Sequence, residues 1–276
     1  MKNTKKLLSL LLALIMVFSL CVPAFAAEET TKLVVLGDSI AQGYGLGEGR
    51  DDWYNLCYGK LIADANGYEY KNHAIGGHTT YNLNERLKED IVIADVADAD
   101  IIAVSIGGNN FLLGGIALMA INGLLFKNYD LIDQTADEFY VDFCLAIDTI
   151  KAINPDATLM VQTLYNPRTD FLKDVYQYGV DRLNAYIVKA AAEKSYTVVD
   201  VAAAFVGHAG EYIQKDVIHP NDAGHYVIAT EYLKVMKAMG LGQAEKPLGD
   251  APITEVPMSL WQQIIEYFKK LLPFLF

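Results

Sequence analysis

The sequence predicts an α/β protein: a three-layer α/β/α sandwich built on a parallel, flavodoxin-like sheet. Short apolar runs that are rich in β-branched residues and bounded by Gly, Asn or Asp indicate buried strands. Longer stretches with an apolar residue every three or four positions indicate helices that cover the sheet. Because these two patterns alternate along the chain, we expect parallel strands with helices on both faces.

Five segments have the composition of strands. They are Leu33 to Leu36, Tyr68 to Asn72, Ile101 to Ile106, Leu159 to Thr163 and Thr197 to Val199, the second having the weakest pattern. One helical face consists of Tyr176, Val180, Leu183, Ile187 and Ala190. A last helix is expected to start near Asp222, whose side chain is placed to cap it. Active sites gather at the carboxyl ends of parallel strands, so the residues that follow each strand are the functional candidates.

The first 26 residues have the plan of a secretory signal peptide. Three lysines open the chain, an apolar run extends from Leu7 to Leu20, and residues 24–26, AFA, form a small-residue cleavage site. The run is shorter than the ~20 residues that span a membrane, and Leu20 stands where a lipoprotein signal needs a small residue. We therefore expect a secreted mature protein that begins at Ala27.

Composition also limits the partners. The formal net charge is −12 at pH 7, and loss of the three signal-peptide lysines makes that of the mature chain −15. Such an acidic chain repels phosphate backbones and has no basic stripe, so nucleic acid is not expected as a partner. Cys57 and Cys144 remain after processing. The sequence leaves open whether they form a disulfide in an oxidising exterior or stay as buried thiols.

The first functional candidate is Ser39, in the segment GDSI (residues 37–40) directly after the first strand. A serine at a strand-to-helix turn exposes its hydroxyl at the edge of the sheet, where it can act as a nucleophile. A serine that follows aspartate at the start of a helix is also an ordinary N-cap. The glycines at 43, 45, 47 and 49 do not have the spacing of a nucleotide-binding loop, so no cofactor is expected.

Two further segments follow the second and third strands and carry groups suited to stabilise an oxyanion. The segment NHAIGGHT (residues 72–79) has two adjacent glycines, the second being Gly77, which let the backbone point an N–H at a ligand. In GGNN (residues 107–110), the Asn109 carboxamide can aim its NH₂ at a developing negative charge. The alternatives are a simple glycine turn and an Asn-rich turn that leaves a strand.

The fourth segment, DVIHP (residues 216–220), supplies a base. Asp216, three residues before His219, can accept its Nδ1–H and leave Nε2 free to take a serine proton. Asp222 and His225 have the same spacing, but Pro220 keeps His219 in a loop, whereas His225 is expected in the first turn of the last helix. A metal site built from these four side chains is a further alternative. No metal-ligand signature such as HExxH appears, so no metal is expected.

The order of these four segments resembles the four sequence blocks of the SGNH hydrolases, the GDSL esterase and lipase family. The resemblance covers residues 33 to about 239. It implies that Ser39 is the nucleophile, that His219 is the base and that Asp216 orients the base.

The same resemblance implies an oxyanion hole formed by the N–H groups of Ser39 and Gly77 and by the side chain of Asn109. One departure from the family pattern is Asn110, where many members have aspartate. Because this position has no core catalytic role in the family, we expect altered local hydrogen bonding rather than lost activity.

The resemblance favours a serine esterase or lipase that acts on carboxylic esters of lipids or short acyl alcohols, and the signal peptide indicates that it is secreted. The segment LYNP (residues 164–167) is similar to that of lipase-like members. The runner-up is a polysaccharide O-deacetylase, and a non-catalytic surface-binding module is an alternative of another class. The nearly uncharged segment 111–126, FLLGGIALMAINGLLF, either walls an acyl pocket or forms a buried helix.

The catalytic domain is expected to span residues 27–241. Residues 242–257 contain three prolines and several charges and are expected to form a linker. Residues 258–276 have a helical apolar face that includes Trp261 and Phe268, with Lys269 and Lys270 on the polar side. Such a C-terminal helix either contacts a membrane surface or packs on the domain or on another copy.

Overall fold

The computed structural model describes residues 30–47 and 53–252, and its helices and strands lie in the unit that starts at Thr31. The predicted signal peptide and the predicted C-terminal helix at 258–276 lie outside the described residues. Among the helices that the structure describes, none combines the length and the apolar character needed to cross a membrane.

The core of the unit is a five-stranded sheet in which every strand is parallel to its neighbours. The strands are β1 (Lys32–Gly37), β2 (Glu69–Asn72), β3 (Ile101–Ser105), β4 (Thr158–Gln162) and β5 (Thr197–Val199). Their order, β2-β1-β3-β4-β5, is that of flavodoxin-like folds. The predicted strands lie within one residue of the observed ones, because β-branched runs bounded by turn residues are strong local signals.

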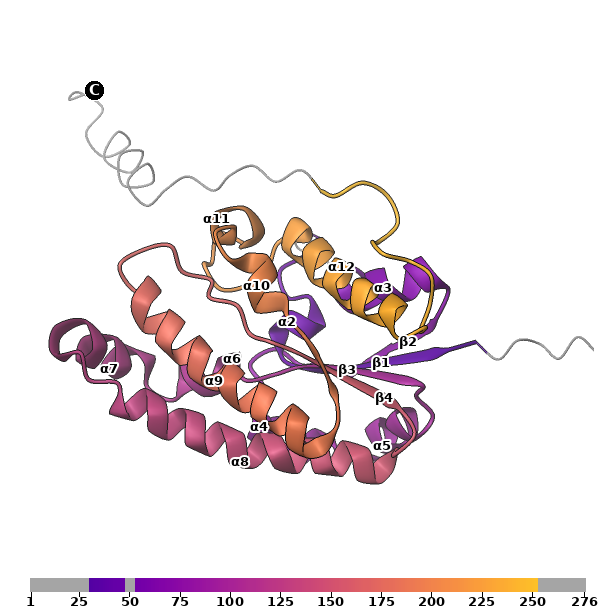
Figure 1. Ribbon diagram of the computed structural model, residues 1–276, viewed down its shortest axis with the longest axis horizontal. Helices are drawn as coiled ribbons and strands as arrows, with labels where there is room; N and C mark the ends of the chain where they lie inside the picture. Colours follow the sequence, from indigo (N-terminus) through magenta and orange to yellow (C-terminus); the bar gives the residue numbers. More distant parts are fainter. Residues whose placement is uncertain (1–29, 48–52, 253–276) are drawn as a thin grey trace, which may run out of the picture. The chain divides into compact units, whose positions relative to one another are not determined.

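Helices cover both faces of the sheet (Figure 1). The cluster of buried side chains on one face includes residues of α4 (Thr80–Arg86), α5 (Asp90–Ala97), α6 (Gly108–Leu113), α8 (Asp130–Ile153) and α9 (Lys173–Lys194). The cluster on the other face includes residues of α2 (Ser39–Gln42), α3 (Tyr58–Asn66), α10 (Val201–Phe205), α11 (Ala209–Tyr212) and α12 (Asp222–Ala238). A short 3₁₀ turn, η1 (Trp53–Asn55), precedes α3. Alternate residues of β1 enter opposite clusters, as the period of two in a strand requires. The predicted three-layer sandwich is confirmed.

The two predicted helices are present, with one correction at a helix start. The five residues of the predicted apolar face are all buried on α9. The last helix begins as expected, but its N-cap is Asn221, whose side-chain oxygen accepts the N–H of Gly224 at 3.0 Å. The prediction that Asp222 caps this helix is therefore wrong by one residue. Asp222 lies in the first turn, where a negative charge suits the helix dipole.

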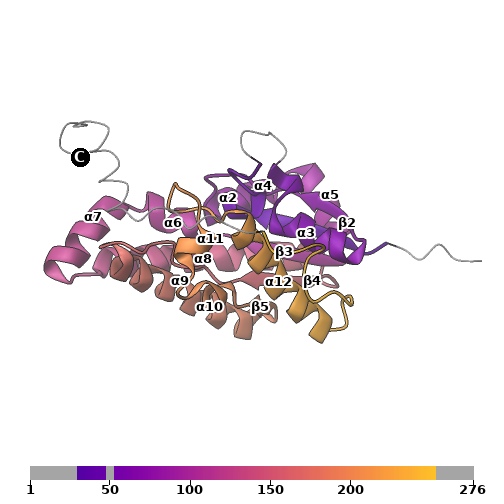
Figure 2. The same cartoon turned by 90° about the horizontal axis from the view of Figure 1, so that it is seen from above.

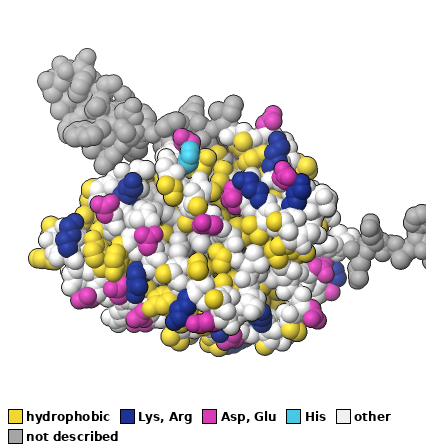
Figure 3. Space-filling view, in the orientation of Figure 1, with side chains coloured by type: hydrophobic (Ala, Val, Ile, Leu, Met, Phe, Trp, Pro, Cys, Tyr) yellow, Lys and Arg dark blue, Asp and Glu magenta, His cyan; other side chains and the backbone are white. Residues whose placement is uncertain are grey.

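The segment 111–126 does not form one buried helix. Its chain turns at Gly115, which has a φ of +100°, and separates α6 from α7 (Ile116–Ile121) and from the π turn η2 (Asn122–Phe126). Phe111 and Met119 are buried, whereas most of the other large apolar side chains are exposed. Figure 1 and Figure 2 both place α7 at one end of the unit, and Figure 3 shows apolar side chains on the surface at that end.

The two cysteines of the domain are unbridged. Cys57 is fully buried, and Cys144 is partly buried and packs against one of the two clusters. The described part of the predicted linker, residues 242–252, contacts the domain. The N–H of Ala244 donates to Asn66 at 3.4 Å on α3, and the Tyr226 hydroxyl of α12 donates to the Gly249 carbonyl at 3.4 Å.

Candidate active site

Ser39 lies at the carboxyl end of β1 as the first residue of α2. The turn into it requires a glycine at 37, which has a φ of +143° and where an added Cβ would lie 1.9 Å from the Ser105 carbonyl oxygen. The Asp38 carboxylate accepts the N–H of Ile40 at 3.0 Å and so caps the helix. The capping role that was the alternative for Ser39 therefore belongs to Asp38, and the serine hydroxyl is left for another partner.

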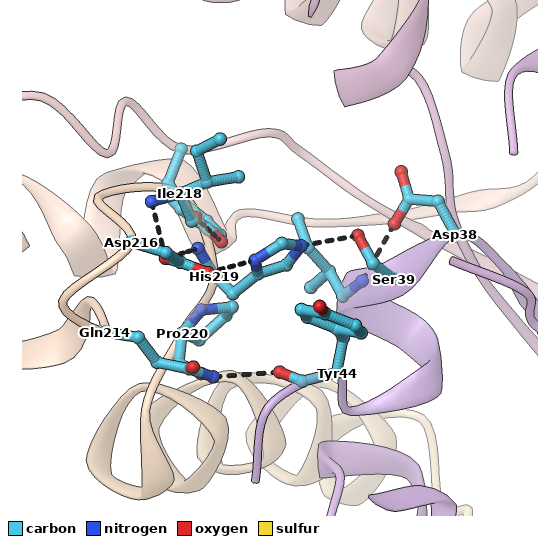
Figure 4. Close-up of polar contacts among 10 residues, drawn as sticks. Asp38, Ser39, Tyr44, Gln214, Asp216, Ile218, His219 and Pro220 are labelled. Atoms are coloured by element: carbon cyan, nitrogen blue, oxygen red, sulfur yellow. Dashed lines mark hydrogen bonds and ion pairs between the residues drawn. The ribbon is translucent and has the colours of Figure 1, made fainter. Parts of the chain in front are cut away.

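That partner is His219, and the hydroxyl, the imidazole and a carboxylate form a chain of hydrogen bonds (Figure 4). His219 Nε2 lies 2.8 Å from Ser39 Oγ, and His219 Nδ1 lies 2.5 Å from Asp216 Oδ2. The other Asp216 oxygen accepts the N–H groups of Ile218 and His219, each at 3.0 Å. Burial acts to raise the pKa of Asp216, but the hydrogen bonds from the His219 ring and these two N–H groups outweigh it and lower the pKa. The carboxylate therefore stays ionised beside the imidazole.

Hydrogen bonds within the His219 loop and from distant parts of the chain hold this loop in place. The Tyr165 hydroxyl donates to the Ile218 carbonyl at 2.9 Å, and the Gln214 N–H donates to the His219 carbonyl at 2.7 Å. The Gln214 side chain also donates to the Tyr44 carbonyl at 2.8 Å (Figure 4). Sequence reasoning missed Gln214 and Tyr44 because their contact joins positions 170 residues apart and no local motif marks it. The segment LYNP was the one sequence signal for Tyr165.

His225, the alternative candidate for the base, has a structural role. His225 is fully buried in the first turn of α12, where its Nδ1 accepts the N–H of Tyr58 at 3.2 Å and so joins α12 to α3. Burial, with a smaller contribution from the charge of His219, lowers the pKa of His225 to about 3. The structure thus brings His219 to Ser39 and uses His225 in packing. Within residues 30–47 and 53–252, no group of three or more His, Cys, Asp or Glu is arranged to hold a metal ion.

The glycine segment after β2 passes over Ser39. The N–H of Gly76 donates to the Gln42 side chain at 2.9 Å, and a Cβ at Gly76 would lie 3.6 Å from the Ser39 Cβ. Gly77 follows with a φ of +82°, a conformation that favours glycine, and an added Cβ there would meet nothing within 4 Å. Gly76 therefore lies beside the serine, and Gly77, the next residue, faces open space.

The asparagines after β3 are tied to the same segment. Asn109 Nδ2 donates to the His78 carbonyl at 3.0 Å, and because an amide carries two N–H bonds, the other stays available to a ligand. Asn110 Nδ2 donates to the Thr80 hydroxyl at 2.8 Å, while its oxygen accepts the Thr80 N–H at 3.1 Å. An ionised aspartate at 110 could accept but not donate, so the asparagine changes the local hydrogen bonding and still links the two segments.

An apolar cavity of ≈ 50 Å³ opens next to Ser39. It is lined by Ile40, Gly108, Phe111, Leu112, Leu164, Tyr165, Pro167, Tyr176, Val180, Leu183 and Ile218. Ile40 and Ile218 directly adjoin the serine and the histidine along the chain. Phe111 and Leu112 come from the uncharged segment 111–126, so the start of this segment forms part of the cavity wall.

Asp38 is a second carboxyl group close to the serine. Its side chain is 1% exposed. Burial raises the pKa of Asp38 to about 7, although the Ile40 N–H and the charge of His219 both act to lower it. A buried carboxyl group that is half-protonated near neutral pH makes the stability of this region depend on pH.

Comparisons with known proteins show the family and the fold. The model of the GDSL-like lipase/acylhydrolase family matches residues 35–227. The uncharacterized protein YpmR of Bacillus subtilis is 24% identical over 228 residues, which cover 78% of this chain and 84% of YpmR. The spore germination lipase LipC of Bacillus licheniformis is 22% identical over 221 residues, which cover 78% of this chain and 99% of LipC. The solved structure of the lipase Lip_vut3 from a goat rumen metagenome has the same fold, with a TM-score of 0.63, 20% identity and coverage of 78% of this chain and 99% of that one.

Proposed function

The chain belongs to the GDSL-like lipase/acylhydrolase family of SGNH hydrolases, and from this premise we propose that it is a secreted serine esterase that cleaves carboxylic esters through an acyl-enzyme intermediate. The observation that carries the proposal is the chain of hydrogen bonds from Ser39 Oγ through His219 to Asp216, with distances of 2.8 and 2.5 Å. At 2.8 Å from the hydroxyl, the imidazole can take its proton, while the carboxylate at 2.5 Å holds the other side of the ring.

In the proposed mechanism, His219 Nε2 takes the proton of Ser39 as its oxygen attacks the ester carbonyl carbon. The negative charge that develops on the carbonyl oxygen is stabilised by the N–H groups of Ser39 and Gly77 and by the Asn109 amide. The imidazolium then protonates the departing alcohol, which leaves an acyl-serine. Water that loses a proton to the same imidazole hydrolyses this ester and releases the acid, while Asp216 orients the ring and remains ionised.

Ester or lipid substrates follow from the family, and the cavity beside Ser39 supports an ester with an apolar acyl chain. Its lining residues are nearly all apolar, and burial of methylene groups against them is favourable by about 0.8 kcal/mol per CH₂. The relatives LipC and Lip_vut3 are both named as lipases. A polysaccharide O-deacetylase would need polar groups to bind the sugar, and the nearly apolar lining of this cavity offers few of them.

Secretion is proposed from residues 1–26, whose basic start, apolar run and AFA cleavage site form the plan of a signal peptide. A peripheral position at the cell surface is proposed from residues 258–276, whose apolar face and lysines suit a lipid–water boundary.

The proposal is tested by the hydrolysis of a chain-length series of aryl esters, beside the release of acetate from an acetylated glycan. We expect the highest kcat/KM on an ester longer than acetate, and a loss of about 10⁴-fold or more in Ser39→Ala because the covalent route is removed. Ser105→Ala is a matched control, since Ser105 is a buried serine at the end of the neighbouring strand β3 and should keep full activity.

Other outcomes lead to different conclusions. Turnover of acetyl esters alone would favour the deacetylase. A folded wild-type protein that cleaves nothing in either set would favour a non-catalytic binding module. Near-normal activity in a folded Ser39→Ala protein would refute the mechanism.

A further inference from the structure

A helical segment next to the cavity exposes an unusual amount of apolar surface. This segment, residues 113–126, is called the apolar arm and comprises the end of α6, α7 and η2. Its exposed side chains, each with half or more of its surface open to solvent, are Leu113, Leu118, Ile121, Leu125 and Phe126. Scattered apolar residues are normal on a protein surface, but a contiguous group marks a site of interaction.

The apolar arm also lacks charge. No Asp, Glu, Lys or Arg occurs between Asp100 and Lys127, in a chain where 20% of the residues are charged. Lys127, at the end of η2, is exposed and has a long apolar stem below its ammonium group. A lysine at this position can keep its charge in water while the apolar side chains before it are buried.

The arm is continuous with the cavity beside Ser39. Phe111 and Leu112 on α6 line the cavity, and the next residue, Leu113, is exposed on the surface. Another exposed apolar side chain, that of Phe171, lies along the chain between two other lining residues, Pro167 and Tyr176. Apolar side chains that line the cavity and apolar side chains exposed on the surface are therefore close along the chain at both places.

We propose that the apolar arm docks on a zwitterionic lipid–water interface and delivers ester substrate from the lipid to the cavity. The occupant is a lipid surface because the arm continues into a cavity suited to an acyl chain, so a lipid can pass between them without exposing its chain to water. Zwitterionic lipid is specified because the arm itself has no charged residue and the mature protein is acidic, with a formal net charge of −15 once the three signal-peptide lysines are removed. The delivery step rests on the proposed esterase function, whereas docking does not require turnover.

Docking is tested by flotation of the full-length mature protein with phosphatidylcholine vesicles. The background is Ser39→Ala, which prevents hydrolysis, together with Trp261→Ser/Phe268→Ser, which removes apolar side chains of the segment 258–276 that is also proposed to contact lipid. The double variant Leu125→Ser/Phe126→Ser removes two large exposed side chains, and we expect it to bind at least about tenfold more weakly. Ile91→Ser is the matched control, because Ile91 is 63% exposed, close to the 72% of Leu125, but lies on α5 at the other end of the unit (Figure 1). Its binding should equal that of the parent.

A second pair of substitutions distinguishes loss of the docking surface from a local folding defect in the first double variant. Leu113→Ser/Leu118→Ser alters the other part of the arm and should weaken binding as well, because both residues are exposed. Unchanged vesicle binding in both double variants would overturn the proposal. So would a wild-type dimer that the double variants dissociate, because the arm would then be a contact between copies.

Turnover separates this inference from the proposed function. With Ser39 intact, the double variants should cleave a soluble short-chain ester at the wild-type rate but cleave an ester embedded in vesicles more slowly. Equal rates on the embedded ester would overturn delivery by the arm. Absence of turnover in the wild type, together with arm-dependent vesicle binding, would refute the esterase function and leave the docking surface standing.

Discussion

Replacing Asp38 with asparagine should make the protein less sensitive to rising pH. The carboxyl group is buried behind Ser39, and burial raises its pKa from 3.8 to about 7. Asparagine has nearly the same shape and keeps the oxygen that accepts the Ile40 N–H at 3.0 Å. The substitution therefore removes the titration and retains the helix cap.

The sign of the change in unfolding free energy with pH follows from whether the folded or the unfolded state binds the proton. Between pH 3.8 and about 7, the folded protein holds a proton on Asp38 and the unfolded chain does not. Stability due to this group is thus present at low pH and is lost as the pH rises through the folded-state pKa, at about 1.4 kcal/mol per pH unit. From pH 5 to pH 8 the wild type should lose about 2.5 kcal/mol relative to Asp38→Asn.

Urea unfolding followed by circular dichroism at pH 5, 6, 7 and 8 measures this difference. The slope of the unfolding free energy against urea should be equal in the two proteins, because both expose the same surface on unfolding. Free energies that change in parallel with pH in the two proteins would show that burial does not keep the proton on Asp38.

Two further predictions concern the site itself. Asn109→Ala should lower kcat by about 10²–10³, because one oxyanion donor is lost; an effect on KM alone would assign the side chain to substrate binding instead. His219→Ala should approach the loss seen in Ser39→Ala. His225→Ala should instead destabilise the fold by about 2–4 kcal/mol, because it leaves a cavity and an unpaired backbone N–H, while the folded fraction stays active. The opposite ranking in kinetic and unfolding assays would mean that the wrong histidine was chosen.

The parts of the fold that sequence predicted are those with local signals. The strands were placed within one residue, and Pro220 correctly separated a loop histidine from a helix histidine. The helix cap was misplaced by one residue because Asn221 and Asp222 both have side chains suited to capping, and only the backbone geometry distinguishes them.

Two other features depended on contacts that no local pattern encodes. The hydrogen bond between Gln214 and Tyr44 joins a side chain to a backbone carbonyl, and a backbone carbonyl is present in every residue type. The segment 111–126 is divided by the turn at Gly115 into α6 and α7, and exposed side chains occur on both sides of this turn. An apolar run by itself does not reveal which of its side chains face outward.

The strand order explains how segments that are far apart in sequence assemble one site. In the order β2-β1-β3, the strand that leads to Ser39 has the strands that lead to Gly77 and Asn109 on either side. Both proposed oxyanion donors can thus reach the serine from flanking strand ends, which the order β1-β2-β3 would not allow because Asn109 would lie two strands away. The fourth segment then needs to reach only the carboxyl end of β1, and the loop before α12 brings His219 there across 180 residues of sequence. The topology therefore accounts for why the serine follows β1, the strand that lies between the two strands that lead to the proposed oxyanion donors.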